Sequence, residues 1–557
     1  MLVPLALCLA PMSALSPVEE PAPRLVVMIA VDQLVPEQLE RLRGHLPGGL
    51  GRLQRQGLRF TAAALPYGTT HTGPGHATFA TGCLPSSHGL VANDFYDRDL
   101  RRDVYCVEDR EALPVTSAGL GVKSKQSRSP RNLRRVSLGA HLRASVPEAK
   151  IVALSGKDRA AITMAGRSGD IAIWWDRTVG AGFVSTQFYG DALPSWVERW
   201  NKGWVERTSG WLWEPSFDVQ QAPPGTAPDE RVGEGMLLGQ GPSFPYTIGD
   251  KPDGVFDEGQ MKALYNGVYK SPLMDRYVLD LAHKALFGEN LGTDEHVDLL
   301  ALSFSSCDAV GHIFGPYSVE VTDTLLRLDH GLGKLFTQLD ERVGKDRWVA
   351  VLTADHGVLP LIESLQAQGV PTRRIGPATQ RALQVRVEAA VAEATGLKGE
   401  QLLRFPTDGT NFDFDLAALA AAGLDVDRVR TIVAKAAVGE NWVQAAYTRA
   451  ELLSNLPTDD PMLRLCRASN TADRGHDVQV VMEPHCLIYT PKWGKTGTSH
   501  GSPHSYDRRI PLIFYGPSFP AEARADEAGS QDVVPTLLEL LGMAPIGPLD
   551  GRTLLQR

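Results

Sequence analysis

Continuous apolar runs recur along the chain, and most of them stop at a polar cluster. Residues 25–31 read Leu-Val-Val-Met-Ile-Ala-Val and end at Asp32. Runs of the same kind cover residues 150–154, 297–304, 348–352 and 510–515. Unbroken short hydrophobic runs are typical of parallel strands that are buried on both faces. The pattern therefore predicts a central sheet whose strands lie in the core.

Helical spacing of apolar positions appears between several of these runs, for example over residues 319–339 and 533–541. Alternating strands and helices favour an α/β fold, in which a mostly parallel central sheet is sandwiched by helices. In such sheets ligands bind at the carboxyl ends of the strands. The polar clusters that follow the apolar runs fall at these ends, so we expect the functional site there.

Two stretches interrupt the alternation. Residues about 160–270 are rich in Trp, Gly and Pro, which suggests an inserted cap with Trp174 and Trp175 in its core. Residues about 365–490 hold an Ala-rich helical part, including 416–422, and then short strands, which we interpret as a second insertion. The predicted organisation is one catalytic domain over residues 24–557 with these two insertions.

The N-terminal residues 1–23 combine a short apolar run with a Pro/Glu-rich spacer, a pattern that resembles a secretory signal although a basic start is missing. We therefore expect a periplasmic or secreted protein. No stretch elsewhere approaches the ~20 apolar residues that a membrane span requires.

Charge and cysteine content narrow the class of protein. The 557 residues carry a formal net charge of −9 without a Lys/Arg cluster, which argues against a nucleic-acid polymer as partner. The six cysteines include no Cys-x-x-Cys metal pattern. One or two disulfides fit an oxidising compartment, but their pairing cannot be read from the spacing. The oligomeric state stays open, a monomer included.

Carboxylate and imidazole side chains gather at the ends of the predicted strands. Asp308 and His312 are one helical turn apart, so both can face one metal ion. Taken singly, such pairs are more often ion pairs or turn residues. Their joint occurrence at strand ends predicts a metal site, and zinc accepts oxygen and nitrogen ligands of these types. The candidate ligands are Asp32, Asp308, His312, Asp355, His356 and His500.

A hydroxyl group lies within a second chemical motif. Thr72 precedes Gly-Pro-Gly, which predicts a tight turn into a helix with Pro near its start. A hydroxyl at a helix N-terminus sits where backbone amides and the helix dipole favour anions. The alternative is an N-cap threonine without chemistry. Thr69, Thr70 and Thr78 are the local competitors for a catalytic role.

These motifs, in this order, resemble the alkaline phosphatase superfamily, in its nucleotide pyrophosphatase/phosphodiesterase-like branch and closest to bacterial alkaline phosphatases of the PafA type. The resemblance runs from about residue 25 to 550. The segments that carry it are Asp32, Thr72-Gly-Pro-Gly-His76, Asn93-Asp-Phe-Tyr-Asp97, Ser155-Gly-Lys-Asp-Arg159, Asp308/His312, Asp355-His356, His500-Gly and Gln531-Asp-Val-Val-Pro-Thr-Leu-Leu.

The resemblance implies two zinc ions per chain and a phosphothreonine intermediate on Thr72. One ion would be held by Asp308, His312 and His500. The other would be held by Asp32, Asp355 and His356, with the Thr72 oxygen adjacent. Manganese or iron would also accept such ligands.

By the same resemblance, Asn93, Lys157 and Arg159 grip the phosphoryl group. A monoester dianion carries one more negative charge than a diester, so the two extra cations favour monoesters. The resemblance thus implies hydrolysis of small-molecule phosphate monoesters, with inorganic phosphate as product. The alternative is a phosphodiesterase or nucleotide pyrophosphatase of the same superfamily.

Other interpretations have weaker support. A sulfatase would need Arg where Ser87 ends the segment Cys83-Leu-Pro-Ser-Ser87. A zinc-stabilised binding protein would require a missing ligand or nucleophile, and none is missing. The remaining histidines of the motifs, His71, His76, His88 and His504, have no expected metal role, although His504 is the most plausible false ligand.

Overall fold

The structure, a computed structural model, describes residues 22–120, 127–178, 180–249, 256–399, 402–404, 410–489 and 495–555. The predicted leader lies outside this part except for its last two residues. An 11-stranded sheet forms the centre of the molecule, in the order β21-β2-β20-β13-β1-β12-β7-β8-β9-β5-β6. The expected α/β class, a largely parallel sheet covered by helices, is confirmed.

The middle of the sheet is parallel. Its strands are β13 (Trp348–Thr353), β1 (Leu25–Val31), β12 (Asp298–Phe304), β7 (Ile151–Ser155) and β8 (Ile171–Trp175). All residues of β13, β1, β12 and β7 are buried, as the unbroken apolar runs predict. The carboxyl ends of these strands therefore meet at one edge of the core.

Antiparallel strands close both sides of the sheet. On one side lie β20 (Leu512–Tyr515), β2 (Leu58–Phe60) and β21 (Ala523–Arg524), with β2 and β21 parallel to each other. On the other side lie β9 (Phe183–Thr186), β5 (Pro114–Thr116) and β6 (Gly119–Leu120).

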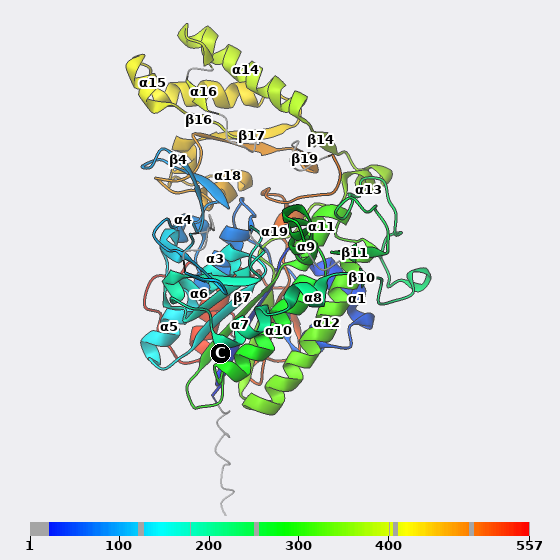
Figure 1. Cartoon of the computed structure of the whole chain (residues 1–557). Coiled ribbons are helices and arrows are strands. Elements are labelled where there is room, and N and C mark those ends of the chain that lie inside the picture. Colours follow the sequence, from blue (N-terminus) through cyan, green and yellow to red (C-terminus); the bar gives the residue numbers. More distant parts are fainter. Residues whose placement is uncertain are drawn as a thin grey trace, which may run out of the picture.

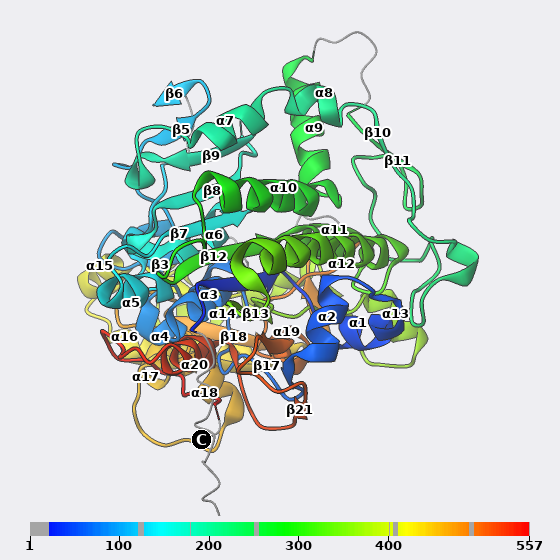
Figure 2. The ribbon, with the colours of Figure 1, turned by 90° about the horizontal axis from the view of Figure 1, so that it is seen from below.

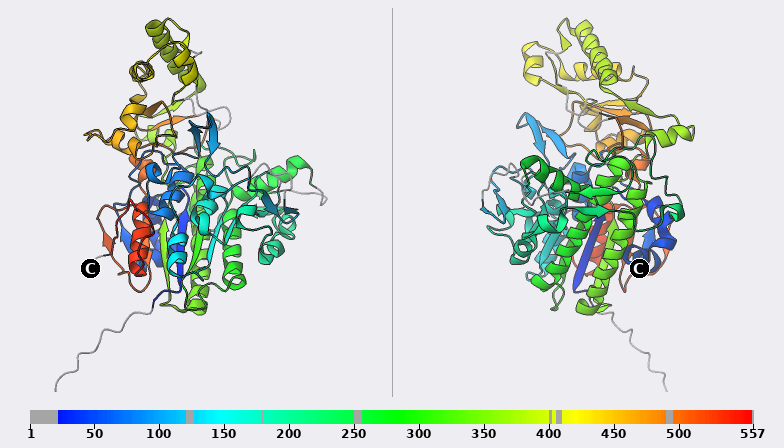
Figure 3. Two further views of the ribbon diagram at one scale, coloured as in Figure 1. Left: turned by 90° about the vertical axis from the view of Figure 1, so that its left-hand side faces the viewer. Right: turned by 45° about the vertical axis from the view of Figure 1, so that its right-hand side comes forward.

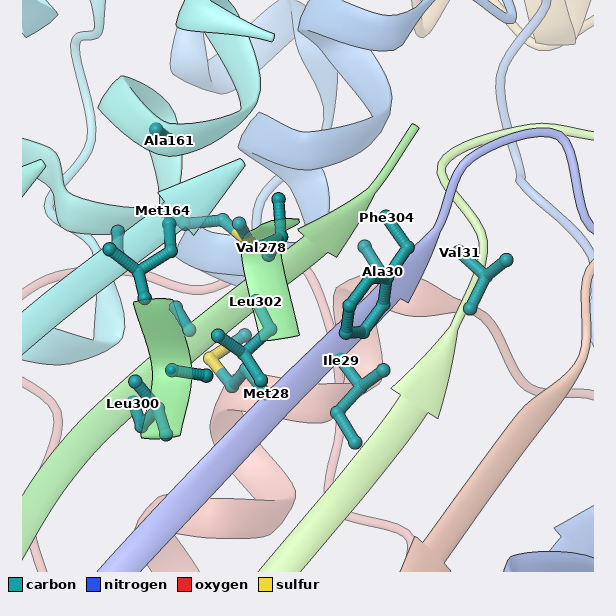
Figure 4. Packing of buried hydrophobic residues seen from close by; sticks show 14 of the residues in the cluster. Met28, Ile29, Ala30, Val31, Ala161, Met164, Val278, Leu300, Leu302 and Phe304 are labelled. Atoms are coloured by element: carbon teal, nitrogen blue, oxygen red, sulfur yellow. The ribbon is translucent and has the colours of Figure 1, made fainter. Parts of the chain in front are cut away.

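Helices cover both faces of the sheet (Figure 2). One face carries α10 (Leu273–Gly288) and α12 (Val319–Leu339), with α2 (Gly49–Gln56) packed on α12. The other carries α3 (Thr72–Thr81), α6 (Asp158–Ala165) and α20 (Val533–Leu540). This division follows from right-handed crossovers that run in opposite directions from the sheet centre. Figure 4 shows Met28, Leu302 and Val278 in the shared core.

The predicted cap at about 160–270 begins later than its composition suggested. Within that range α6, β8 and β9 belong to the central sheet and its helical layer, and Trp174 and Trp175 of β8 are buried in the main core. The chain leaves the sheet only after β9. The elements that follow are α7 (Ser195–Asn201), α8 (Trp204–Thr208), β10 (Trp211–Trp213), β11 (Tyr246–Ile248) and α9 (Glu258–Tyr269).

Most of the range 365–490 forms a lobe that projects from the main body (Figures 1 and 3). The lobe has a hydrophobic cluster of its own, which includes Leu383, Val433 and Trp442. Its elements are β14 (Arg373–Ile375), α14 (Pro377–Thr395), β15 (Leu403–Arg404), β16 (Asp413–Phe414), α15 (Leu416–Ala421), α16 (Val426–Ala437), β17 (Val443–Thr448), α17 (Arg449–Leu452), α18 (Pro461–Arg467), β18 (Val478–Met482) and β19 (Cys486–Ile488).

Five cysteines lie in the described part of the chain, and all of them are buried and free: Cys83, Cys106, Cys307, Cys466 and Cys486. The sixth, Cys8, lies outside that part. Among the described helices, none is both long and apolar enough to cross a bilayer.

Candidate active site

Three adjacent strands deliver the acidic candidates to one place. Asp32 follows β1, Asp308 lies on α11 (Ser306–Phe314) just after β12, and Asp355 comes shortly after β13. His500 arrives from the segment between the lobe and β20. The structure thereby assembles two groups of three residues, and within each group the ligand atoms lie within 4.8 Å of one another. The groups are Asp308, His312, His500 and Asp32, Asp355, His356.

Backbone carbonyl groups fix the orientation of all three histidine rings. Nδ1 lies 2.8 Å from the Thr498 oxygen in His312, 3.0 Å from the Gly357 oxygen in His356 and 2.8 Å from the Thr70 oxygen in His500. A carbonyl oxygen only accepts hydrogen bonds, so each Nδ1 carries the proton. In the neutral ring the Nε2 lone pair is then left to face the site, as in histidines that ligate metals.

The Nε2 atoms point at carboxylate oxygens. His312 Nε2 is 3.0 Å and His500 Nε2 is 3.6 Å from Asp308 Oδ1, while His356 Nε2 is 3.4 Å from Asp32 Oδ1. Among the described residues, Asp32 Oδ1 and His356 Nε2 are buried without a hydrogen-bond partner. Two facing acceptors repel each other unless a cation or a proton lies between them. The donor set therefore fits a bound cation.

Protonation states support the same interpretation. Burial lowers the pKa of His356 to about 4 and that of His500 to about 3, which keeps both rings neutral at physiological pH. His312 differs, because the charge of Asp308 outweighs burial and raises the pKa of His312. Burial, together with the charges of Asp308 and Asp355, raises the pKa of Asp32. Several buried carboxylates in one site disfavour each other's charge, and a divalent cation relieves this repulsion.

Thr72 is the first residue of α3 and is 1% exposed. The start of α3 lies directly against the segment of Asp355: a Cβ on Gly75 would be 2.1 Å from the Asp355 carbonyl oxygen. Only glycine permits this approach. The Gly73 N–H donates to Asn93 Oδ1 over 2.7 Å, which leaves the Asn93 amide N–H₂ as a donor for a ligand.

Two cations converge on the Thr72 hydroxyl. Lys157 Nζ is 3.4 Å and Arg159 Nη2 is 3.1 Å from Thr72 Oγ1. Lys157 Nζ is also 2.5 Å from Asp32 Oδ2 and 2.6 Å from Asp308 Oδ2. The Lys157 ammonium therefore contacts the Thr72 hydroxyl and one carboxylate of each ligand group. Burial alone would lower the pKa of Lys157, but the charges of Asp308 and Asp32 outweigh it and raise that pKa. Lys157 is therefore an ammonium.

Arg159 is held by a network for which the sequence pattern gives no signal. Arg159 Nη1 donates to the Tyr105 hydroxyl over 3.4 Å, and that hydroxyl donates to Asp158 Oδ1 over 2.6 Å. Arg128 Nε donates to the other oxygen of Asp158 over 3.1 Å. The side chains of Lys157, Asp158 and Arg159 therefore take part in specific contacts and do not simply extend into solvent.

The hairpin of β3 (Asp94–Asp97) and β4 (Arg102–Tyr105) links this network to the lobe. Asn93 precedes β3 and Tyr105 ends β4, and the Cys106 N–H donates to the Asn93 carbonyl oxygen over 2.8 Å. At the far end, Arg98 Nη2 donates to Asp477 Oδ1 in the lobe over 2.8 Å. In Figure 1 the hairpin lies between the lobe and the main body.

Three other histidines of the motifs, and Thr78, make hydrogen bonds or close contacts with neighbouring residues. His76 Nδ1 lies 3.3 Å from Asp355 Oδ2 and its Nε2 lies 2.8 Å from Ser303 Oγ. His88 Nε2 contacts Thr78 Oγ1 at 3.1 Å. His504 Nε2 lies 2.8 Å from the Met482 carbonyl oxygen, and His504 belongs to neither ligand group. One residue that the motifs do not single out, Gln33, contacts both groups.

Comparisons with known proteins find relatives that match nearly the whole chain. The model of the type I phosphodiesterase / nucleotide pyrophosphatase family matches residues 26–507. Alkaline phosphatase PafA of Elizabethkingia meningoseptica is 30% identical over 94% of this chain and 92% of its own length. Alkaline phosphatase PhoK of a Sphingomonas species is 31% identical over 96% of this chain and 91% of its own length.

The crystal structure of wild-type PafA superimposes with a TM-score of 0.84 at 29% identity, and the match covers 96% of this chain and 98% of that one. A structure of murine ectonucleotide pyrophosphatase / phosphodiesterase 5 shares the fold at a TM-score of 0.51 and 13% identity. The chain belongs to the type I phosphodiesterase / nucleotide pyrophosphatase family of the alkaline phosphatase superfamily.

Proposed function

We propose that this chain is an alkaline phosphatase, a hydrolase of phosphate monoesters that uses Thr72 as nucleophile. The main support is the position of the Thr72 hydroxyl at a helix N-terminus, where it contacts both Lys157 and Arg159. The two candidate metal-ligand groups lie beside it. Similarity to two alkaline phosphatases over more than nine-tenths of the chain supports the proposal.

The chain's own groups bind the phosphoryl group. Lys157, Arg159 and the free amide of Asn93 all lie around Thr72, and each offers donors to non-bridging phosphate oxygens. Two fixed cations favour a dianion over a monoanion, which selects monoesters. Because these contacts all go to phosphate, we expect broad tolerance for the alcohol part.

The reaction proceeds in two displacements. The Thr72 hydroxyl loses its proton to water, and Thr72 Oγ forms a bond to phosphorus while the bond from phosphorus to the ester oxygen breaks. The alcohol leaves with a proton returned from water. Water then attacks the phosphothreonine, which releases inorganic phosphate and restores the hydroxyl. The α3 N-terminus and Arg159 stabilise negative charge on the phosphoryl oxygens in both steps.

Two zinc ions would complete the proposed site: Asp308, His312 and His500 would hold one, and Asp32, Asp355 and His356 would hold the other. Carboxylate oxygens and imidazole nitrogens of this kind are ligands that zinc accepts. When bound, the ions supply positive charge that lowers the pKa of a hydroxyl and stabilises a leaving oxygen.

Replacing Lys157 or Arg159 by alanine tests the choice of substrate class. Each change should reduce kcat/KM for a phosphate monoester by roughly 10²–10³-fold, because a charged donor to the transferred group is lost. Diester hydrolysis should fall much less. The measurement compares kcat/KM for p-nitrophenyl phosphate and bis-p-nitrophenyl phosphate.

Arg159→Lys is the matched control, since it keeps the charge but loses the planar fork, and it should fall between wild type and Arg159→Ala. Equal losses on both esters would instead favour the phosphodiesterase alternative.

We also propose that the protein is exported, on the strength of the apolar and Pro/Glu-rich pattern of residues 1–23. The full chain expressed in a Gram-negative host should appear in the periplasmic fraction or the medium, without the leader by N-terminal sequencing. Recovery of the uncleaved chain from the cytoplasm would contradict export.

A further inference from the structure

Gln33 touches both ligand groups although no motif assigns it a role. It directly follows Asp32 and is 1% exposed. Its backbone N–H donates to Asp355 Oδ1 over 3.2 Å, and its side-chain Nε2 donates to Asp308 Oδ1 over 3.0 Å. A φ of 70° places the residue in the left-handed region, which costs free energy for a side chain of this type. The fold holds this conformation at the junction of the two groups.

The helix that carries Asp308 and His312 leaves room for the Gln33 carboxamide. A Cβ on Gly311 would lie 2.2 Å from Gln33 Oε1. Since Gly311 stands between the two ligands on α11, this turn of the helix approaches Gln33 closely only because it lacks a side chain there. The hydrogen bond from Gln33 to Asp308 therefore depends on Gln33 itself and on the absence of a side chain at Gly311.

Asp308 needs an external constraint on its orientation. The carboxylate torsion of an aspartate has a broad energy profile, so the backbone alone does not fix it. Oδ1 of Asp308 lies 3.0 Å from His312 Nε2 and 3.6 Å from His500 Nε2, and the same atom accepts the hydrogen bond from Gln33. An amide donor holds the oxygen in place and, being uncharged, leaves the negative charge of the carboxylate available to a cation.

We propose that Gln33 is a positioning residue that orients the Asp308 carboxylate toward its metal ion and couples the two ligand groups. The inference rests on the proposed function in that the groups bind metal. Gln33 has no direct contact with the substrate or the Thr72 hydroxyl in this role, so its influence on the reaction passes through the two carboxylates.

The test uses Gln33→Met, which keeps the side-chain length but removes the donor, and Gly311→Ala, which pushes the carboxamide away. Gln38→Met is the matched control. Gln38 is also fully buried, but its Nε2 donates to the Pro316 carbonyl oxygen and it contacts no ligand. The full-length proteins are purified with zinc, and metal content per chain and the rate of zinc transfer to an excess chelator are measured.

Both Gln33→Met and Gly311→Ala should weaken zinc retention by roughly 10–100-fold, the usual effect of removing a hydrogen bond to a metal ligand. Gln38→Met should keep the wild-type zinc content and transfer rate, even at a lower melting temperature. The proposal is overturned if Gln33→Met and Gly311→Ala retain zinc like wild type, or if Gln38→Met loses it equally.

The wild-type protein separates this inference from the proposed function. Zinc bound by wild type and lost from the two variants supports Gln33 in its role. Zinc bound equally by all variants rejects the role of Gln33 while the metal site stands. A wild-type protein that binds no zinc rejects both. If Gln33→Met fails to fold, Gly311→Ala decides the question.

Discussion

Thr72→Ala should lower kcat for phosphate monoesters by at least about 10³-fold, because the atom that attacks phosphorus is removed. The variant leaves Lys157, Arg159 and both ligand groups in place, so phosphate should still bind. Zinc content should equal that of wild type. Steady-state kinetics on p-nitrophenyl phosphate, inhibition by inorganic phosphate and elemental analysis together measure these three properties.

Two further variants make the Thr72 result specific. Thr72→Ser retains a hydroxyl and should recover most of the lost rate. Thr78→Val changes a buried threonine of the same helix, whose hydroxyl contacts His88 and not the ligand groups, and it should stay near the wild-type rate. Acid quenching of wild type during turnover should trap one phosphoryl group on the peptide that contains Thr72. A Thr72→Ala enzyme with more than a tenth of the wild-type rate would remove Thr72 from the mechanism.

The middle of the fold can be predicted from the sequence because its strands are buried on both faces. Such strands do not alternate polar and apolar side chains, so β1, β12 and β13 each stand out by at least four consecutive apolar residues. The polar residue after each run then marks the carboxyl end of a strand. This one rule is enough to predict that Asp32, Asp308 and Asp355 share an edge of the sheet.

The sides of the sheet are harder to predict. β2, β5 and β6 are only two or three residues long, and β2 and β5 reach the sheet through β20 and β9, which are distant in the chain. The aromatic composition after residue 160 hides β8 and β9, because Trp174 and Trp175 suit a cap core as well as a sheet core. The local sequence pattern cannot distinguish a cap core from a sheet core, because the answer depends on which strand β8 pairs with.

The residues of the site also differ in how well the sequence predicts their roles. Side chains that are candidates to meet a metal or phosphate directly, such as Asp308 and His312, have types and spacings that indicate that chemistry. Gln33 and Tyr105 contact those side chains through hydrogen bonds, and neither residue type signals such a role. Only the three-dimensional contact shows what they orient. The tautomers of the three histidines also depend on carbonyl groups from other segments.

Removal of metal should abolish activity and also lower stability. Without divalent cations, Asp32, Asp308 and Asp355 remain buried together, and a ligand that binds only the folded state stabilises it by about 4 kcal/mol at 1,000 times its Kd. Protein treated with a chelator and dialysed should therefore lose at least about 10³-fold in monoester kcat/KM and melt at a lower temperature. Two equivalents of zinc should restore both properties.

Thr72→Ala provides the control that separates the two effects of zinc. Since Thr72 belongs to neither ligand group, the variant should show the same rise in melting temperature on zinc addition while remaining inactive. Asp308→Asn should show a reduced rise, because one anionic ligand becomes neutral. If wild-type protein proven free of metal by elemental analysis hydrolyses monoesters at an undiminished rate, the buried carboxylates and imidazoles must serve some purpose other than holding catalytic cations.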